Sequence, residues 1–150
     1  MILNRQKRVR VALPLLDKFA RRVRRELRLD GRELSICLVS DAEMARLNRR
    51  YRGKNKATDV LSFSAGNDAG LKPGATNRRR QESGGTLLGD IAIAPMVARR
   101  NAKRFGRTLP DELRILILHG VLHLMGYDHE RDSGQMERRE RILRRRLGLE

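Results

Sequence analysis

The chain has three histidines, and all three fall in one short stretch, HGVLHLMGYDH. His119 and His123 are four positions apart, so on a helix they project from the same face, one turn apart. Two imidazoles in this arrangement can occupy two adjacent positions around one metal ion. Gly126 follows and can end the helix in a left-handed conformation, after which the chain turns back. We therefore expect His129 to reach a third position around the same ion.

Three imidazole ligands with no cysteine nearby suit Zn²⁺, with Ni²⁺ and Cu²⁺ as alternatives on affinity. A single histidine is more often a hydrogen-bonded core residue than a ligand, but three at this spacing on an otherwise apolar segment favour metal binding. A site with three protein ligands leaves a fourth position open for water, which is typical of catalytic zinc centres. The sequence thus predicts one metal ion per chain, used for hydrolysis.

Gly120 distinguishes between two kinds of hydrolase. The spacing H-x3-H-x2-G-x2-H is also that of the metzincin peptidases, which place a glutamate general base directly after the first histidine. Here that position is Gly120, so the usual base is missing and a zinc metallopeptidase is the less favoured alternative. Glycine inside a helix costs about 1 kcal/mol relative to alanine. We expect Gly120 to give room beside the metal to substrate or to a neighbouring backbone.

The chain is strongly basic: 34 Lys and Arg residues against 18 Asp and Glu residues give a net charge of +16. Such a charge attracts polyanions, although a solvated arginine-rich surface is the simpler alternative. Aromatic residues are 3% and tryptophan is absent, which favours contact with phosphates over base stacking. The start of the chain does not resemble a secretory signal, no long apolar run occurs, and the single cysteine cannot form an internal disulfide. These features favour a cytoplasmic protein without a membrane span.

The apolar patterning predicts one α+β domain over residues 1–150, with about five helices around a small sheet. The helix over 109–125 is apolar on nearly all sides, so it should be the buried central helix that carries the metal ligands. The other helices are expected from Pro14 to about Leu27, from the capping box Ser40–Glu43 to about Arg50, and at 95–105 and 133–147. Strands are expected at 2–6, 34–39, 60–63 and 87–94.

Segment 66–86 separates the strands expected at 60–63 and 87–94. It is rich in Gly, Asn and Arg and has no apolar period, so we expect a long mobile hairpin loop. Arg78, Arg79 and Arg80 follow one another in this loop and are candidates for substrate contact.

Two further segments carry recognisable patterns, LNRRYRGKNKATDVLSF at 47–63 and LLGDIAIAP at 87–95. They resemble L-N-x-x-Y-R-x-K-D-x-P-T-D-V-L-S-F and L-G-D-I-x-I of the YbeY family, bacterial endoribonucleases that act in ribosomal RNA maturation. HGVLHLMGYDH is similar to the family's H-G-x-L-H-L-x-G-Y-D-H signature. The resemblance covers essentially the whole chain. The chain departs from it at Asn55, Ala57 and Ser64, where the family usually has Asp, Pro and Pro.

This resemblance implies an α+β fold with a small mixed sheet and a metal ion held by His119, His123 and His129. It also implies hydrolysis of single-stranded RNA, with Arg52 of the Y-R-x-K block in catalysis and His119 at the catalytic centre. An arginine is planar, bidentate and always charged, so Arg52 suits the stabilisation of negative charge on phosphoryl oxygens.

Two neighbours of these residues are weaker candidates. Lys54 follows Arg52 closely and is a candidate for phosphate contact. Asp128 precedes the third histidine, where its carboxylate can hydrogen-bond an imidazole ligand or cap the turn, and we favour the turn.

The resemblance further implies a role late in ribosome maturation, in processing the 3′ end of 16S rRNA and in ribosome quality control. The implied partners are RNA of the small ribosomal subunit, ribosomal proteins and an assembly GTPase, in the cytoplasm. A non-catalytic ribosome assembly factor, in which the metal only braces the fold, is the remaining alternative.

Overall fold

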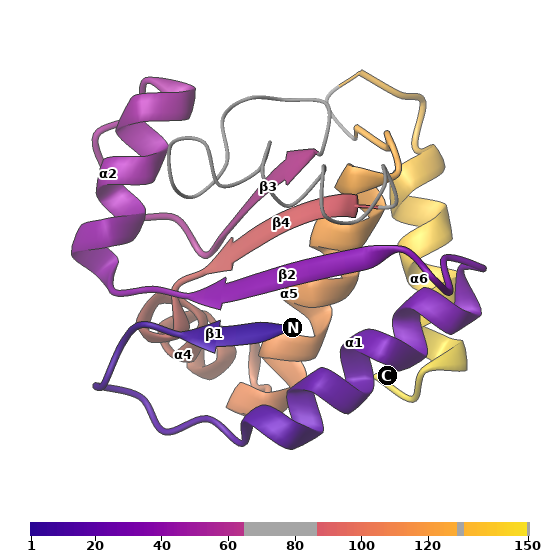
Figure 1. The fold of residues 1–150 in the computed structure, drawn as a ribbon, viewed down its shortest axis with the longest axis horizontal. Coiled ribbons are helices and arrows are strands. Elements are labelled where there is room, and N and C mark those ends of the chain that lie inside the picture. The colour runs from indigo at the N-terminus through magenta and orange to yellow at the C-terminus, as the bar shows by residue number, and fades with distance from the viewer. Residues whose placement is uncertain (65–86, 129–130, 150) are drawn as a thin grey trace.

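The computed structural model describes residues 1–64, 87–128 and 131–149. Its sheet has four strands in the order β1-β2-β4-β3 (Figure 1). The strands are β1 (Ile2–Asn4), β2 (Glu33–Leu38), β3 (Val60–Ser64) and β4 (Leu87–Ile93). β2 runs parallel to both β1 and β4, whereas β3 is antiparallel to β4. The sheet is therefore mixed, as expected.

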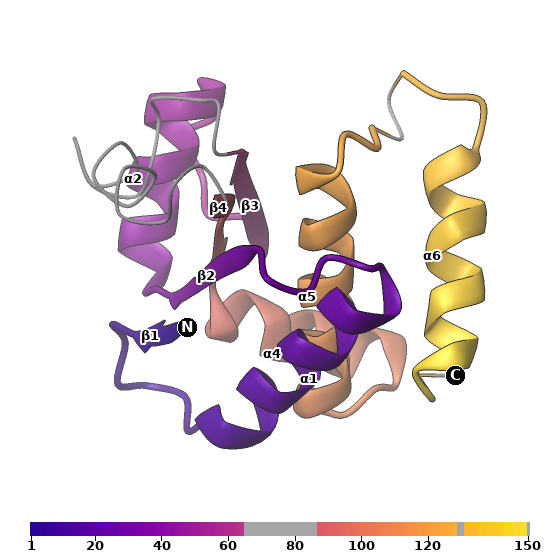
Figure 2. The ribbon, with the colours of Figure 1, turned by 45° about the vertical axis from the view of Figure 1, so that its right-hand side comes forward.

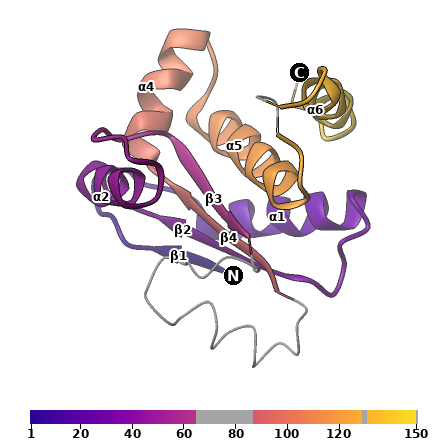
Figure 3. The ribbon, with the colours of Figure 1, turned by 90° about the horizontal axis from the view of Figure 1, so that it is seen from above.

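Helices cover both faces of this sheet. Those described are α1 (Leu13–Glu26), α2 (Asp41–Arg52), α4 (Pro95–Phe105), α5 (Leu109–Leu124) and α6 (Gln135–Arg146). α2 lies on one face, and α5 lies on the other with α1, α4 and α6 packed around it (Figure 3). This is the α+β fold that the sequence predicts. Within the described ranges, no helix is both long and apolar enough to span a membrane.

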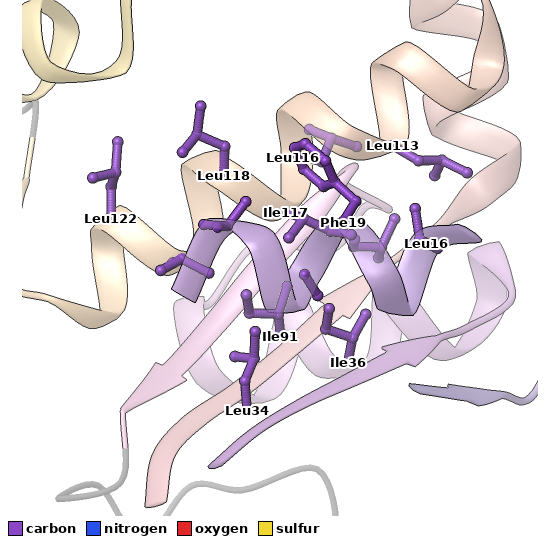
Figure 4. Packing of buried hydrophobic residues seen from close by; sticks show 14 of the residues in the cluster. Leu16, Phe19, Leu34, Ile36, Ile91, Leu113, Leu116, Ile117, Leu118 and Leu122 are labelled. Atoms are coloured by element: carbon purple, nitrogen blue, oxygen red, sulfur yellow. The ribbon is translucent and has the colours of Figure 1, made fainter. Parts of the chain in front are cut away.

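The main core lies between the sheet and α5. Figure 4 shows Leu16 and Phe19 of α1 and Ile117 of α5 packed over Ile36 and Ile91 of the sheet. Side chains alternate along a strand, so Cys37 and Ala92 lie on the opposite face in a second cluster with Met44 and Leu47 of α2. α5 is consequently buried along most of its length, and we find it at the centre of the molecule (Figure 2).

Predicted element boundaries agree with the structure to within about two residues, and two of the differences have clear causes. β1 ends at Asn4 instead of Gln6 because the Gln6 side chain bonds the backbone of Val9 in both directions. α2 continues to Arg52, since its amides remain bonded until Gly53, which has a φ of 68° and donates to the Arg49 carbonyl. Arg52 is thus the last residue of a helix and does not belong to the following loop.

Two glycines allow the last turns of α5 to approach the sheet closely. A Cβ on Gly120 would lie 2.8 Å from Cδ1 of Ile91, and one on Gly89 of β4 would lie 2.5 Å from the Phe63 carbonyl oxygen and 2.7 Å from Leu124 Cδ2. The expectation that Gly120 makes room for substrate or a backbone is therefore wrong. The room is filled by the Ile91 side chain, and the glycine serves packing of the helix on the sheet.

Candidate metal centre

A cavity of about 570 Å³ lies at the C-terminal ends of α5 and α2, beside β3. Its volume is within the usual range for ligand sites. The last turns of both helices contribute to its lining, and the negative end of a helix dipole favours cations nearby. The cavity is lined by Arg52, Thr58, Asp59, Val60, Leu61, Ser62, Ser64, His119, His123, Leu124, Gly126, Tyr127 and Asp128.

The structure brings two of the predicted metal ligands together. Nε2 of His119 lies 3.1 Å from Nε2 of His123, and the two rings meet edge to face with centroids 4.7 Å apart. Both side chains line the cavity and are half-buried. The helical spacing and the packing of α5 thus bring two ring nitrogens close together at the cavity.

The chain turns sharply after these histidines. Gly126 has a φ of 100°, and its amide donates to the His123 carbonyl at 3.0 Å, so the helix ends as expected. His129 lies outside the described residues, as do Arg78, Arg79 and Arg80. Among the residues that the structure does describe, no group of three or more His, Cys, Asp or Glu side chains is placed to hold a metal ion.

Behind His119 lies a carboxylate that the sequence analysis did not identify. Oε1 of Glu140, on α6, is 2.8 Å from Nδ1 of His119, and its Oε2 accepts from Nη2 of Arg144 at 2.9 Å. Burial alone would raise the pKa of Glu140. The hydrogen bond from His119 and the charge of Arg144 outweigh burial, so this pKa lies below its ordinary value.

The role of Glu140 could have been suspected from its position in the sequence. The apolar stripe of α6 consists of Met136, Leu143 and Leu147, which are all buried. Position 140 belongs to the same stripe, because residues three and four apart share a helix face. A carboxylate inside an apolar stripe indicates a buried partner, since a charge is rarely buried unpaired.

The contacts of Glu140 determine which nitrogen of His119 carries a proton. An ionised carboxylate can only accept hydrogen bonds, so Nδ1 of His119 must be the donor. In a neutral imidazole the other nitrogen then carries a lone pair and no proton. Nε2 of His119 therefore presents its lone pair on the side of the cavity, 3.1 Å from Nε2 of His123.

Arg52 reaches the same cavity from the opposite wall. It is exposed at the end of α2, and the loop after it is tied back to the helix. The buried amide of Asn48 donates to the Lys56 carbonyl at 2.8 Å, and the Lys54 amide donates to the Asn48 carbonyl at 3.3 Å. Lys54 is exposed and does not line the described cavity. Asn48 was not recognised from the sequence.

Asp128 lines the cavity and shapes the turn. Its carbonyl accepts from the amides of Arg131 and Asp132, and its carboxylate lies 3.5 Å from Nε of Arg131. Nδ1 of His119 is occupied by Glu140, so the hydrogen bond between Asp128 and an imidazole ligand stays a prediction for the other histidines. On the other side, the Ser62 hydroxyl donates to the Gly120 carbonyl at 3.2 Å and joins β3 to α5 beside the histidines.

These residues fit a zinc ion. Zinc–imidazole bonds are about 2.0–2.1 Å long, so two adjacent ligands of one ion have nitrogens a little over 3 Å apart, which is close to the separation found here. Imidazole ligands commonly donate their second N–H to a carboxylate, as His119 does to Glu140. The donor set is therefore suited to a transition metal.

Known proteins resemble the chain along its length. The family model described as Endoribonuclease YbeY matches residues 1–148. The Endoribonuclease YbeY of Solibacter usitatus is 44% identical over 136 residues, covering 91% of this chain and 80% of that protein. The Endoribonuclease YbeY of Syntrophotalea carbinolica is 40% identical over 150 residues, covering 96% and 92%.

A solved structure has the same fold. The solution structure of TM1509 from Thermotoga maritima matches with a TM-score of 0.61 at 24% identity, covering 98% of this chain and 89% of that one. At this identity the match supports the arrangement of helices and strands, while the family model and the closer relatives support membership of a family. On those grounds this chain belongs to the YbeY endoribonuclease family.

Proposed function

We propose that this chain is a metal-dependent endoribonuclease that hydrolyses phosphodiester bonds of single-stranded RNA in the cavity between α5, β3 and α2. The main support is the convergence of two imidazole nitrogens, 3.1 Å apart, and the Arg52 guanidinium on one cavity. The family to which the chain belongs is named for endoribonuclease activity, and the metal dependence and the strand preference are proposed here on the chemistry of the cavity.

His119 and His123 would hold the metal through Nε2, and His129 is the proposed third ligand. Bound at this position, a zinc ion supplies Lewis acidity, which makes water a competent nucleophile near neutral pH. His119 is prepared for this role because its proton is on Nδ1, so no proton has to leave Nε2. Nickel or copper could bind the same donors.

Arg52 is proposed to bind and stabilise the scissile phosphate. A phosphodiester carries one negative charge, and attack on phosphorus spreads further charge over the phosphoryl oxygens. A guanidinium can donate two parallel hydrogen bonds to such oxygens. The negative ends of α5 and α2 would otherwise repel the substrate, and a cation at Arg52 offsets this repulsion.

The natural substrate is proposed to be ribosomal RNA, in particular the 3′ end of 16S rRNA within the small subunit, during late ribosome maturation and quality control in the cytoplasm. The net charge of +16 supports binding to a polyanion. Ribosomal proteins and an assembly GTPase are the further proposed partners.

A peptidase is disfavoured by the position of Gly120. A glutamate there would have its Cβ 2.8 Å from Ile91 Cδ1, inside the packed junction between α5 and β4. The general base of the metzincin pattern would have to displace the buried Ile91 side chain at this point of the helix. The other alternative, a non-catalytic assembly factor braced by its metal, is distinguished from a nuclease by the experiment that follows.

The decisive experiment combines metal analysis with cleavage assays on single-stranded RNA, duplex RNA and casein, before and after chelation. We expect about one equivalent of zinc per chain, and cleavage of single-stranded RNA that stops on chelation and returns with added Zn²⁺. Casein should stay intact. A zinc-loaded, folded protein that cuts no RNA, and that unfolds on chelation, would favour the assembly factor instead.

A further inference from the structure

Glu140 is largely buried although its side chain carries a carboxylate. It lies on the buried stripe of α6 between Met136 and Leu143, and its side chain is 16% exposed. Removing a carboxylate from water is costly unless it is paired and hydrogen-bonded. Since replacing such a buried pair with apolar residues is often neutral or stabilising, fold stability alone does not account for a carboxylate here.

Both oxygens of this carboxylate are engaged by different elements. Oε1 meets Nδ1 of His119 on α5 at 2.8 Å, and Oε2 meets Nη2 of Arg144, one turn further along α6, at 2.9 Å. Arg144 is similarly buried, with 17% of its side chain exposed. Arg144 holds the carboxylate in place from one side while the carboxylate holds the imidazole from the other.

The consequence for His119 is a fixed ring and a fixed proton. The 2.8 Å bond restrains rotation of the imidazole, and it requires a hydrogen on Nδ1. The Nε2 lone pair then lies on the side of the cavity, 3.1 Å from Nε2 of His123, before any ligand arrives. A free imidazole would have to select this tautomer and orientation upon binding, at a cost in affinity.

We propose that Glu140, supported by Arg144, is a positioning residue that holds His119 in its Nδ1–H tautomer and aims Nε2 into the cavity, so that α6 is a functional part of the site. This proposal rests on the proposed function for the role of the metal. The tautomer of His119, however, is a property of the metal-free protein, and it can be measured even if the metal proposal is wrong.

The test compares Glu140→Ala and Glu140→Gln with Glu137→Gln, which removes an exposed carboxylate from the same helix. Ring ¹⁵N chemical shifts of the metal-free proteins, recorded at a pH where imidazoles are neutral, report the tautomer of each histidine. We expect the Nδ1–H form of His119 in the wild type and in Glu137→Gln. Glu140→Ala should lose that preference, and Glu140→Gln should keep it in part because its amide oxygen can still accept.

Zinc affinity, measured by competition with a chromophoric chelator, is the second readout. Loss of a carboxylate behind a ligating histidine typically lowers metal affinity by about 10–100-fold. We expect a loss in this range for Glu140→Ala and a loss toward its lower end for Glu140→Gln, with Glu137→Gln unchanged. An Arg144→Met variant should show a smaller loss than Glu140→Ala.

A purely structural link between α5 and α6 would behave differently. If Glu140→Ala kept the Nδ1–H tautomer and wild-type zinc affinity and merely melted at a lower temperature, the proposal would be overturned. If that variant failed to fold, unchanged zinc affinity in folded Glu140→Gln would overturn it equally. A wild-type protein that bound no zinc, yet showed the predicted tautomer, would refute the metal site and leave the positioning of His119 standing.

Discussion

Helices α5 and α2 both end at the candidate site, and both are followed within two residues by a glycine of positive φ, Gly126 and Gly53. They differ in how firmly they are held. Nine of the sixteen residues of α5 are buried, against three of the twelve in α2. The histidines therefore project from a helix that is buried in the core, whereas Arg52 is exposed at the end of a helix that is held along one stripe.

This difference matches what each group is proposed to do. Metal ligands have to be placed within a fraction of an ångström, and α5 achieves this through close packing at Gly120 and the buried contact with Glu140. A guanidinium on a long side chain can adjust to a moving phosphate, so a helix that is held along one stripe is sufficient. The two walls of the site, α5 with its histidines and α2 with Arg52, should therefore be separable by mutation.

The largest effect is expected from His123→Ala, on the α5 wall. The variant should lose zinc and cleave RNA more than about 10³-fold more slowly, because the several kcal/mol of charge stabilisation that a metal supplies correspond to at least that factor. It should stay folded, since His123 is half-buried. Metal analysis measures the zinc content, circular dichroism reports whether the variant is folded, and cleavage assays give the rate.

Met125→Ala is the matched control for His123→Ala, because Met125 is an exposed residue on the same turn. It should keep both zinc and activity. Normal zinc content in His123→Ala would remove this residue from the proposed ligands, and loss of cleavage with unchanged RNA binding would separate catalysis from binding.

Arg52→Ala should lower cleavage by about 10²–10³-fold, the usual cost of removing one donor to transition-state charge, while zinc content stays unchanged. Arg46→Ala removes an exposed arginine from the same helix outside the cavity and should have little effect. If both variants lost activity equally, Arg52 would contribute general positive charge to RNA binding and no specific stabilisation.

Gly120→Ala should destabilise the protein by about 1–3 kcal/mol, as overpacking of a core does, although alanine is the better helix former. The added methyl would meet Ile91, which is fully buried. Urea unfolding measures the change in the free energy of unfolding. In an Ile91→Val background, which lacks Cδ1, the cost of Gly120→Ala should be smaller, and an unchanged cost would place the strain elsewhere.

The elements of both walls could be predicted from the sequence because they depend on local patterns. Ser40 caps α2 through the expected side-chain bond, Thr108 caps α5 in the same way, and the apolar pattern of α5 marks it as the central helix. What could not be predicted depends on contacts between distant segments. The close contact with Ile91 of β4 explains why position 120 is a glycine. Glu140 lies 21 residues from the histidine that it contacts. Spacing along one helix carries no information on these partners.

The smallest effect is expected on the α2 wall, where the buried Asn48 side chain holds the loop that follows Arg52. Asn48→Ala removes the 2.8 Å hydrogen bond to the Lys56 carbonyl. A typical hydrogen bond contributes about 1 kcal/mol, so we expect a modest loss of stability and a several-fold loss of cleavage through a less well-placed Arg52. Zinc affinity, which depends on α5, should not change.

Ser40→Ala provides a matched loss of stability at the other end of the same helix, since removing an N-cap costs about 1 kcal/mol. Its effect on cleavage should be negligible because the cap lies at the far end of α2 from Arg52. If Ser40→Ala and Asn48→Ala slowed cleavage alike, activity would follow the overall stability of α2. If Asn48→Ala weakened zinc binding, the two walls would be coupled, and the contrast between a rigid ligand helix and an adjustable arginine helix would have to be abandoned.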